Sequence, residues 1–232
     1  MAPIVNQASP NPGPLRSSSE VADVLRRAIV AGDLAPNERL VELDLARDLM
    51  TNRAVIRGAL ALLEHQRLVV REPNRGVRVR AYTSEEAAEI LETRAMLEGL
   101  VARRAARDLD AAGEASLAEI LRSMRACRDA GDLLGYSQLN TAFHRTILEI
   151  GHHETAAMLL DVLQTQVVRY QFRTVLAPGR IGLSLGEHEA IFAALRAHDE
   201  AAAERAMHAH IRAVVETVRS IGGSATSPLK SM

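Results

Sequence analysis

Three histidines have the spacing of inward-facing residues on three separate helical segments. His144, His188 and His210 each share a helical stripe with apolar side chains. Because imidazole binds zinc, nickel, copper and iron, the three side chains could converge on one divalent ion. Asn140 stands one turn before His144, and its amide oxygen could serve as a weaker fourth ligand. Hydrogen-bonded core histidines would give the same pattern, so periodicity alone leaves both interpretations open.

Arginines form a second chemically informative group. Arg53 and Arg57 stand four residues apart at the start of a predicted helix, so both project from one face. Arginine is the usual bidentate partner of guanine, and a recognition helix contacts bases mainly through its N-terminal residues, which here include Asn52. Arg75 and Gly76 lie at a predicted hairpin tip, where an arginine beside a flexible glycine could enter a minor groove. The alternative is an ordinary helix pair with a solvated arginine face.

The segments that carry these arginines predict a winged helix-turn-helix over residues 15–82. Apolar residues recur at helical spacing in three segments, and two short strands then flank a turn. Thr51 or Asn52 can cap the third helix. The predicted elements are a helix from Ser17 to about Gly32; a short helix with apolar Leu43, Leu45, Ala46 and Leu49; a helix from Arg53 with apolar Val55, Ile56, Ala59, Leu60, Leu62 and Leu63; and strands at Leu68–Val70 and Val77–Val79.

The rest of the chain predicts an all-α bundle of six helices over residues 84–221, which makes the fold mainly α. We expect a disordered arm at residues 1–14, which hold four prolines, and a flexible tail at residues 222–232. The predicted helices are Ser84–Leu109, Glu114–Ala130, Asp132–Ile150, Glu154–Val175, Leu183–Ala197 and Glu200–Ile221, with breaks at Gly113, Gly131, Gly151–His153, Pro178-Gly179 and Asp199.

Charge is distributed unevenly along the chain. The whole sequence has 28 basic and 29 acidic residues, a net charge of −1. Residues 15–80 hold 12 Arg against 9 acidic residues, or +3, which leaves 16 basic against 20 acidic residues, or −4, elsewhere. The excess of positive charge therefore coincides with the segment expected to meet nucleic acid.

A single cysteine, Cys127, excludes a disulfide framework and fits a reducing cytoplasm. No apolar run approaches the roughly 20 residues that span a bilayer, and the N-terminus lacks the signature of a signal peptide. We therefore expect a soluble cytoplasmic protein with no membrane partner.

The segment Asn52–Leu60 resembles the recognition-helix signature of GntR-type bacterial regulators. That signature is Ser-Arg-Thr-Pro-Val-Arg-Glu-Ala-Leu, and this chain has Asn-Arg-Ala-Val-Ile-Arg-Gly-Ala-Leu. Both arginines and the Ala-Leu pair are kept, whereas the Ser, Thr, Pro and Glu are replaced. The resemblance implies a DNA-binding domain, but the operator sequence transfers less well.

The second part resembles the FCD branch of that family, the helical domain named after the C-terminal half of the fatty-acid regulator. Many members bind a divalent metal through an Asp and three His, and a small organic acid then coordinates the metal. The carry-over gives His144, His188 and His210, with Asn140 at the aspartate position, a departure that should weaken metal binding. The matching segments are Glu92–Glu98, Ala142–His144, Glu187–Ile191 and Met207–His210.

The leading functional prediction is a ligand-responsive regulator that binds a palindromic operator as a homodimer. A small carboxylate would contact the metal and Arg94, and would shift the placement of the DNA-binding domains. The alternative role of Arg94 is a helix-surface ion pair with Glu98. Two rival functions stay open: a metal-dependent hydrolase with an accessory basic domain, which lacks a recognisable general base, and a DNA-binding regulator without an effector.

Overall fold

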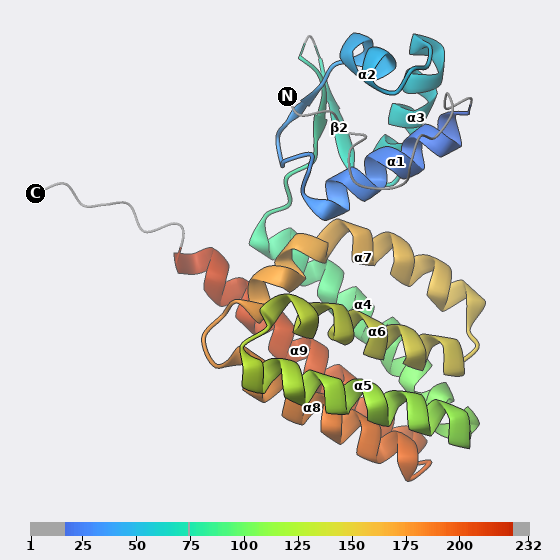
Figure 1. Cartoon of the computed structure of the whole chain (residues 1–232), viewed down its shortest axis with the longest axis vertical. Coiled ribbons are helices and arrows are strands. Elements are labelled where there is room, and N and C mark those ends of the chain that lie inside the picture. Colours follow the sequence, from blue (N-terminus) through green and yellow to red (C-terminus); the bar gives the residue numbers. More distant parts are fainter. Residues whose placement is uncertain (1–16, 74, 225–232) are drawn as a thin grey trace, which may run out of the picture. The chain divides into compact units, whose positions relative to one another are not determined.

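The computed structural model describes residues 17–73 and 75–224, which form two compact units that divide between Tyr82 and Thr83 (Figure 1). Each unit has its own hydrophobic core. The predicted arm at residues 1–14 and most of the predicted tail lie outside the described residues. The predicted fold class, a winged helix-turn-helix followed by a six-helix bundle, is confirmed.

The first unit begins with helix α1 (Ser18–Ala31), whose two ends are set by local chemistry. Ser17 and Glu20 form a capping box in which each side chain accepts a hydrogen bond from the other residue's backbone N–H. The helix ends at Gly32, which adopts φ +92°, a left-handed conformation that glycine reaches without a Cβ clash. Helix α1 buries one apolar face in the core of the unit.

Helices α2 (Glu42–Asp48) and α3 (Arg53–His65) form the helix-turn-helix. Asn52 caps α3, because its side-chain oxygen accepts hydrogen bonds from the backbone N–H groups of Ala54 and Val55, both at 3.0 Å. Two of the apolar residues in the predicted pattern, Leu43 and Leu62, do not join the buried core, since they are 63% and 41% exposed. Each stands two positions from a buried leucine, and residues at that spacing point to opposite sides of a helix.

A small antiparallel sheet completes the unit, with strands β1 (Arg39–Leu40), β2 (Val69–Glu72) and β3 (Gly76–Val79) in the order β1-β3-β2. The predicted two-stranded hairpin is therefore a three-stranded sheet. The added strand, β1, is only two residues long and carries no readable alternation. Gly76 has φ +83° where β3 leaves the turn, so this position needs a residue that tolerates a left-handed backbone.

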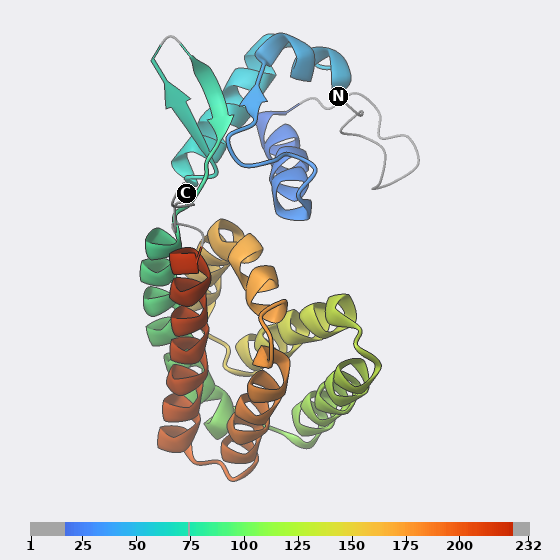
Figure 2. The same ribbon diagram turned by 90° about the vertical axis from the view of Figure 1, so that its left-hand side faces the viewer.

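The second unit consists of helices α4–α9 of the described residues, which pack around an aliphatic core. Figure 2 shows α9 running alongside α4, and these two helices share the most extensive contact in the unit. The helices are α4 (Ser84–Asp108), α5 (Ala111–Ala130), α6 (Leu133–Ile150), α7 (Glu154–Val175), α8 (Arg180–Arg196) and α9 (Glu200–Ser224).

Two glycines that predicted helix ends lie inside helices. Gly113 sits in the first turn of α5, where the Asp110 side chain accepts a hydrogen bond from its N–H at 2.7 Å. Gly222, predicted as the start of a flexible tail, belongs to α9, which continues to Ser224. A Cβ at position 222 would stand 2.1 Å from the Ser84 hydroxyl, so glycine here permits α9 to approach the start of α4.

Candidate metal centre and nucleic-acid interface

The helical unit brings His144 of α6, His188 of α8 and His210 of α9 together. One nitrogen from each ring can be chosen so that all three lie within 4.8 Å of one another. The ring centroids are separated by 4.5 Å between His188 and His210 and by 5.1–5.5 Å in the other two pairs. His188 and His210 are buried, and His144 is partly buried. The predicted convergence of the three histidines is thus present in the fold.

Each ring has a polar neighbour at its Nδ1 atom. The Nδ1 of His144 lies 2.5 Å from a Glu98 carboxylate oxygen, and that of His210 lies 2.7 Å from Glu187. The Nδ1 of His188 faces the Ser184 hydroxyl at 3.4 Å. Carboxylates in this position fix the tautomer and orientation of metal-binding histidines and leave Nε2 available as the ligand atom.

Both carboxylates are held in turn by buried arginines. Glu98 pairs with Arg94 at 2.6 Å, and Glu187 forms a two-pronged pair with Arg180 at 2.8 and 3.2 Å. Two arginine–glutamate–histidine chains therefore converge on the cluster. Burial would raise the pKa of Glu98, but Arg94 and His144 outweigh it and hold the pKa well below the usual range. Glu98 is therefore an anion that can support a cation nearby.

Burial keeps two of the histidines neutral. The pKa of His188 is lowered well below its usual value by burial and then by the neighbouring His210 and His144. Burial, followed by His144 and Arg180, lowers the pKa of His210 in the same way. Metal binding requires unprotonated imidazole. These two rings are already in the form that binds a metal.

The donor set fits a divalent ion such as zinc or nickel. Zinc accepts three imidazoles and leaves a fourth position for another ligand. The Nε2 of His188 is buried and meets no hydrogen-bond partner in the described part of the chain, as expected of an atom placed for a ligand. Asn140 lines the same cavity as His144. Its role as a fourth ligand stays a prediction.

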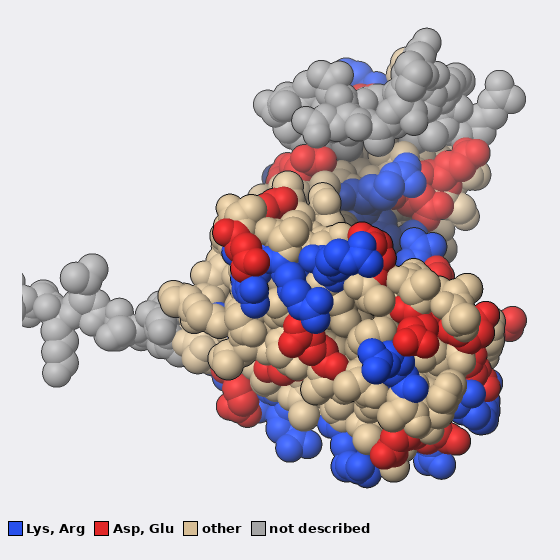
Figure 3. All heavy atoms as spheres, turned by 60° about the horizontal axis from the view of Figure 1, so that its bottom comes forward, with Lys and Arg blue, Asp and Glu red and all other residues tan. Residues whose placement is uncertain are grey.

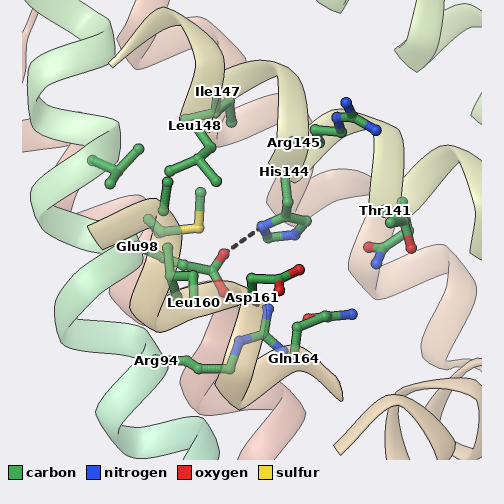
Figure 4. A pocket seen from close by; sticks show the side chains of 14 residues that line it. Arg94, Glu98, Thr141, His144, Arg145, Ile147, Leu148, Leu160, Asp161 and Gln164 are labelled. Atoms are coloured by element: carbon green, nitrogen blue, oxygen red, sulfur yellow. Dashed lines mark hydrogen bonds and ion pairs between the residues drawn. The ribbon is translucent and has the colours of Figure 1, made fainter. Parts of the chain in front are cut away.

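A cavity of about 510 Å³ opens beside His144 (Figure 4). Its wall includes Arg94 and Glu98 of α4, whose side chains Figure 4 shows directed towards the cavity together with Asp161 and Gln164 of α7. Arg94 is 4% exposed, and its Nε and Nη1 atoms are buried without a hydrogen-bond partner among the described residues. The predicted alternative for Arg94, a helix-surface ion pair, is wrong about its location, because the Arg94–Glu98 pair is buried.

The sequence did not reveal the residues behind the histidines. Glu187 projects away from the adjacent His188, as its helical position predicts, but it reaches His210 on the next helix. The sequence indicates Glu98 only as part of a motif and as the partner of Arg94. One signal in the sequence could have revealed them. Arg94, Glu98 and Arg180 are charged residues at helical positions that face the core, where apolar residues are expected.

The predicted DNA-reading residues lie on the first unit, and most of them are exposed. Arg53 and Arg57 extend from the start of α3, with side chains 60% and 61% exposed. Arg75 is exposed beside Gly76 at the hairpin tip. The Asn52 side-chain oxygen is engaged as the α3 cap, so its part in positioning the helix is structural, and a base contact through its amide nitrogen stays a prediction.

The surface of the helical unit contrasts with this cluster of arginines. On the face drawn in Figure 3, the basic and acidic side chains of the helical unit are interspersed. Several belong to exposed ion pairs, such as Arg145–Glu149 on α6 and Arg125–Glu189 between α5 and α8. A mixed surface of this kind does not attract a polyanion strongly. None of the helices in the described part of the chain is both long and apolar enough to cross a membrane.

A winged helix-turn-helix joined to a separate helical unit defines a class of DNA-binding transcriptional regulators. Comparison with known proteins gives the family. Residues 17–79 match the model of the bacterial regulatory proteins of the gntR family, and residues 89–213 match the FCD domain. The chain belongs to the GntR family of transcriptional regulators, in its FCD branch. The family consists of regulators and not enzymes, so the hydrolase alternative is wrong.

Relatives cover nearly the whole chain. The transcriptional repressor GlaR of Escherichia coli K12 is 30% identical over 201 residues, which are 81% of this chain and 89% of GlaR. The repressor RspR of the same organism is 27% identical over 88% of this chain and 90% of RspR. Among solved structures, Escherichia coli McbR/YncC has a TM-score of 0.70 at 19% identity, covering 89% of this chain and 99% of that one. A GntR regulator of Rhodococcus sp. RHA1 has a TM-score of 0.68 at 24% identity, covering 88% and 97%. These two structures support the fold.

Proposed function

We propose that this protein is a cytoplasmic, ligand-responsive transcriptional regulator that binds a palindromic operator as a homodimer. A small carboxylate enters the cavity of the helical unit, contacts a divalent metal held by the histidine cluster, and alters operator binding. The cytoplasmic location follows from the role, because the operator is in chromosomal DNA.

The observation that carries the proposal is the state of Arg94. Its guanidinium is buried at the cavity wall, yet only Nη2 has a partner, Glu98, while Nε and Nη1 have none in the described structure. Buried N–H donors without partners are costly, and a carboxylate that accepts from them removes the cost. A positively charged guanidinium near a metal site selects an anion over a neutral ligand.

The chain's own residues supply the metal site. His144, His188 and His210 would hold the ion through Nε2, with Glu98 and Glu187 fixing two of the rings. When bound, a divalent ion supplies an electrophilic centre for an effector carboxylate. Asn140 contributes its amide oxygen, which attracts a cation less than a carboxylate does, so Asn140→Asp should tighten metal binding.

The connection of the units suggests how the signal leaves the cavity. Helix α4 carries both Arg94 and Glu98, and only four residues separate its start at Ser84 from the end of strand β3 at Val79. An effector that engages Arg94 therefore acts on the helix that is joined directly to the wing. This short connection supports a response of the DNA-binding unit to the cavity.

Metal loading followed by a ligand screen tests the proposal. Wild-type protein is incubated with zinc or nickel, desalted, and analysed for bound metal. We expect about one equivalent in the wild type and in His65→Ala, whose histidine lies at the end of α3, and little in the variant with alanine at positions 144, 188 and 210. The loaded protein is then heated with acetate, malate, citrate or gluconate.

At least one acid should raise the melting temperature of the wild type and leave the triple variant unchanged. Full metal retention by the triple variant would place the ion elsewhere. A metal-loaded protein that responds to none of a broad set of acids would favour the alternative of a DNA-binding regulator without an effector.

A further inference from the structure

A carboxylate lies between the two recognition arginines. Glu42, the first residue of α2, places the same oxygen, Oε2, 3.4 Å from Arg53 Nη2 and 3.5 Å from Arg57 Nε. The Glu42 side chain is only 21% exposed, whereas both arginines are about three times as exposed. The acid therefore sits behind the guanidinium groups at the start of the recognition helix.

This position is unfavourable for simple attraction to DNA. A negative charge at the face that meets phosphates lowers the affinity for every sequence, because binding to DNA is dominated by neutralisation of the backbone. The unit carries an excess of arginine, so an additional acid at this point weakens the general attraction where it would be strongest. Its presence is explained better by a benefit to sequence discrimination than by a benefit to affinity.

We propose that Glu42 is a specificity-determining positioning residue for DNA recognition. It holds the Arg53 and Arg57 guanidinium groups in the orientation that meets base edges, and its charge opposes their capture by phosphates of unrelated sequences. The inference rests on the proposed function, in which these two arginines contact bases. Discrimination built from both an attraction to the right partner and a repulsion of the wrong one is a common design.

The arginines keep enough donors to read bases while Glu42 holds them. A guanidinium has five N–H donors, and each of these contacts uses the donors of a single nitrogen. Arg57 is contacted through Nε, which leaves both terminal nitrogens for a two-pronged contact to guanine. Holding a long side chain in place before binding also reduces the conformational entropy lost on forming the complex.

Glu42→Gln tests the role, with Glu64→Gln as the matched control. Glu64 belongs to the same unit, pairs with Arg71 at 3.5 Å, and loses the same charge on substitution. The two DNA probes are a duplex enriched from a random library by the wild-type protein and a scrambled duplex of equal composition. Fluorescence anisotropy gives both affinities across a salt titration.

For Glu42→Gln we expect tighter binding to the scrambled duplex and a fall in the ratio of the two affinities of roughly two- to thirtyfold, the range that two surface ion pairs would produce. Glu64→Gln should leave the ratio within about twofold of the wild type, because a change of net charge alone acts on both duplexes. Glu42→Asp keeps the charge but withdraws the oxygen by one methylene. It should lower affinity for the enriched duplex while binding the scrambled duplex as the wild type does.

An unchanged ratio for Glu42→Gln and Glu42→Asp, combined with loss of enriched-duplex binding in Arg53→Ala and Arg57→Ala, would overturn the role of Glu42 and leave the proposed function intact. Wild-type affinity in both arginine variants would overturn both. Circular dichroism and thermal unfolding of every variant separate a loss of fold from a change in recognition. If Glu42→Gln does not fold, Glu42→Asp decides the question.

Discussion

The two units of this protein use the same ion pairs, arginine with carboxylate, in opposite ways. In the DNA-binding unit the contacts of Arg53 and Arg57 with Glu42 are 3.4 and 3.5 Å long, and the arginines are mostly exposed to water. In the helical unit the Arg94–Glu98 contact is 2.6 Å long and both side chains are at least nine-tenths buried. The exposed arginines can exchange Glu42 for another partner at little cost in free energy. The buried pair holds its two side chains in one orientation.

The difference follows from solvation. Water screens an exposed pair, so each arginine can leave its carboxylate when a base or phosphate offers an alternative. A buried pair loses its solvation on folding, and removal of one partner strands the other charge in a medium of low dielectric constant. The protein therefore places its adaptable charges on the face proposed to bind DNA and its fixed charges around the histidines.

The largest expected effect comes from breaking the buried pair. Glu98→Ala leaves Arg94 without its only described partner and His144 without its carboxylate. We expect the free energy of unfolding of the helical unit to fall by about 3–5 kcal/mol, measured by urea denaturation. Glu149→Ala, which removes an exposed partner of Arg145 at 2.9 Å, is the control and should cost less than about 1 kcal/mol. Equal losses in the two variants would erase the contrast between the units.

Sequence patterns predicted what depends on neighbours along the chain. Caps and helical periodicity gave all six helices of the second unit, and the ends of α7 agree to the residue. The pairing of Glu98 with His144 joins residues 46 apart, and that of Glu187 with His210 joins residues 23 apart. Such contacts depend on how the helices pack against one another. The periodicity of a single sequence does not predict that packing. Strand β1 was missed because two residues have no alternation.

The second effect concerns the exposed arginines. Arg53→Ala and Arg57→Ala should each weaken binding to the enriched duplex by about 1–3 kcal/mol if they make two-pronged base contacts. Neither change should alter the stability of the unit much, because both side chains are exposed. Gel-shift or anisotropy measurements give the affinity, and Arg26→Ala on α1 serves as the control. Wild-type binding by both variants would remove α3 as the recognition helix.

The third effect is a dependence of stability on pH. His188 and His210 have a lowered pKa in the folded state. Below the unfolded value of 6.5, protons therefore bind preferentially to the unfolded chain, and the free energy of unfolding decreases as the pH is lowered. Between pH 6.5 and 5.5, each histidine should remove about 1 kcal/mol from the unfolding free energy of metal-free protein. Urea titrations in chelator measure the slope, and a His188→Gln, His210→Gln double variant should flatten it. A wild-type slope that survives in the double variant would assign the effect to other groups.

The smallest effect lies at the wing. Arg75→Ala should reduce the slope of log affinity against log salt by about 0.9, because one fewer phosphate-region contact displaces a counterion. Gly76→Val should also weaken binding, since position 76 has φ +83° and a β-branched residue resists that conformation. A salt titration that superimposes Arg75→Ala on the wild type would show that the wing does not contact DNA.

Binding of metal and acid at the histidine cluster should control how the exposed arginines of the first unit bind DNA. The most direct test measures affinity for the enriched duplex with metal-loaded protein, with and without the acid that stabilises it most in the thermal screen. We predict that this acid changes the affinity of the wild type by about 5- to 150-fold, the usual range of coupling between sites. Arg94→Ala strands Glu98 and so destabilises the helical unit, but it should still bind the duplex through the first unit, which has its own core, and lose the response to the acid. An acid that stabilises the wild type without altering DNA affinity would contradict the account, and so would an equal response in Arg94→Ala.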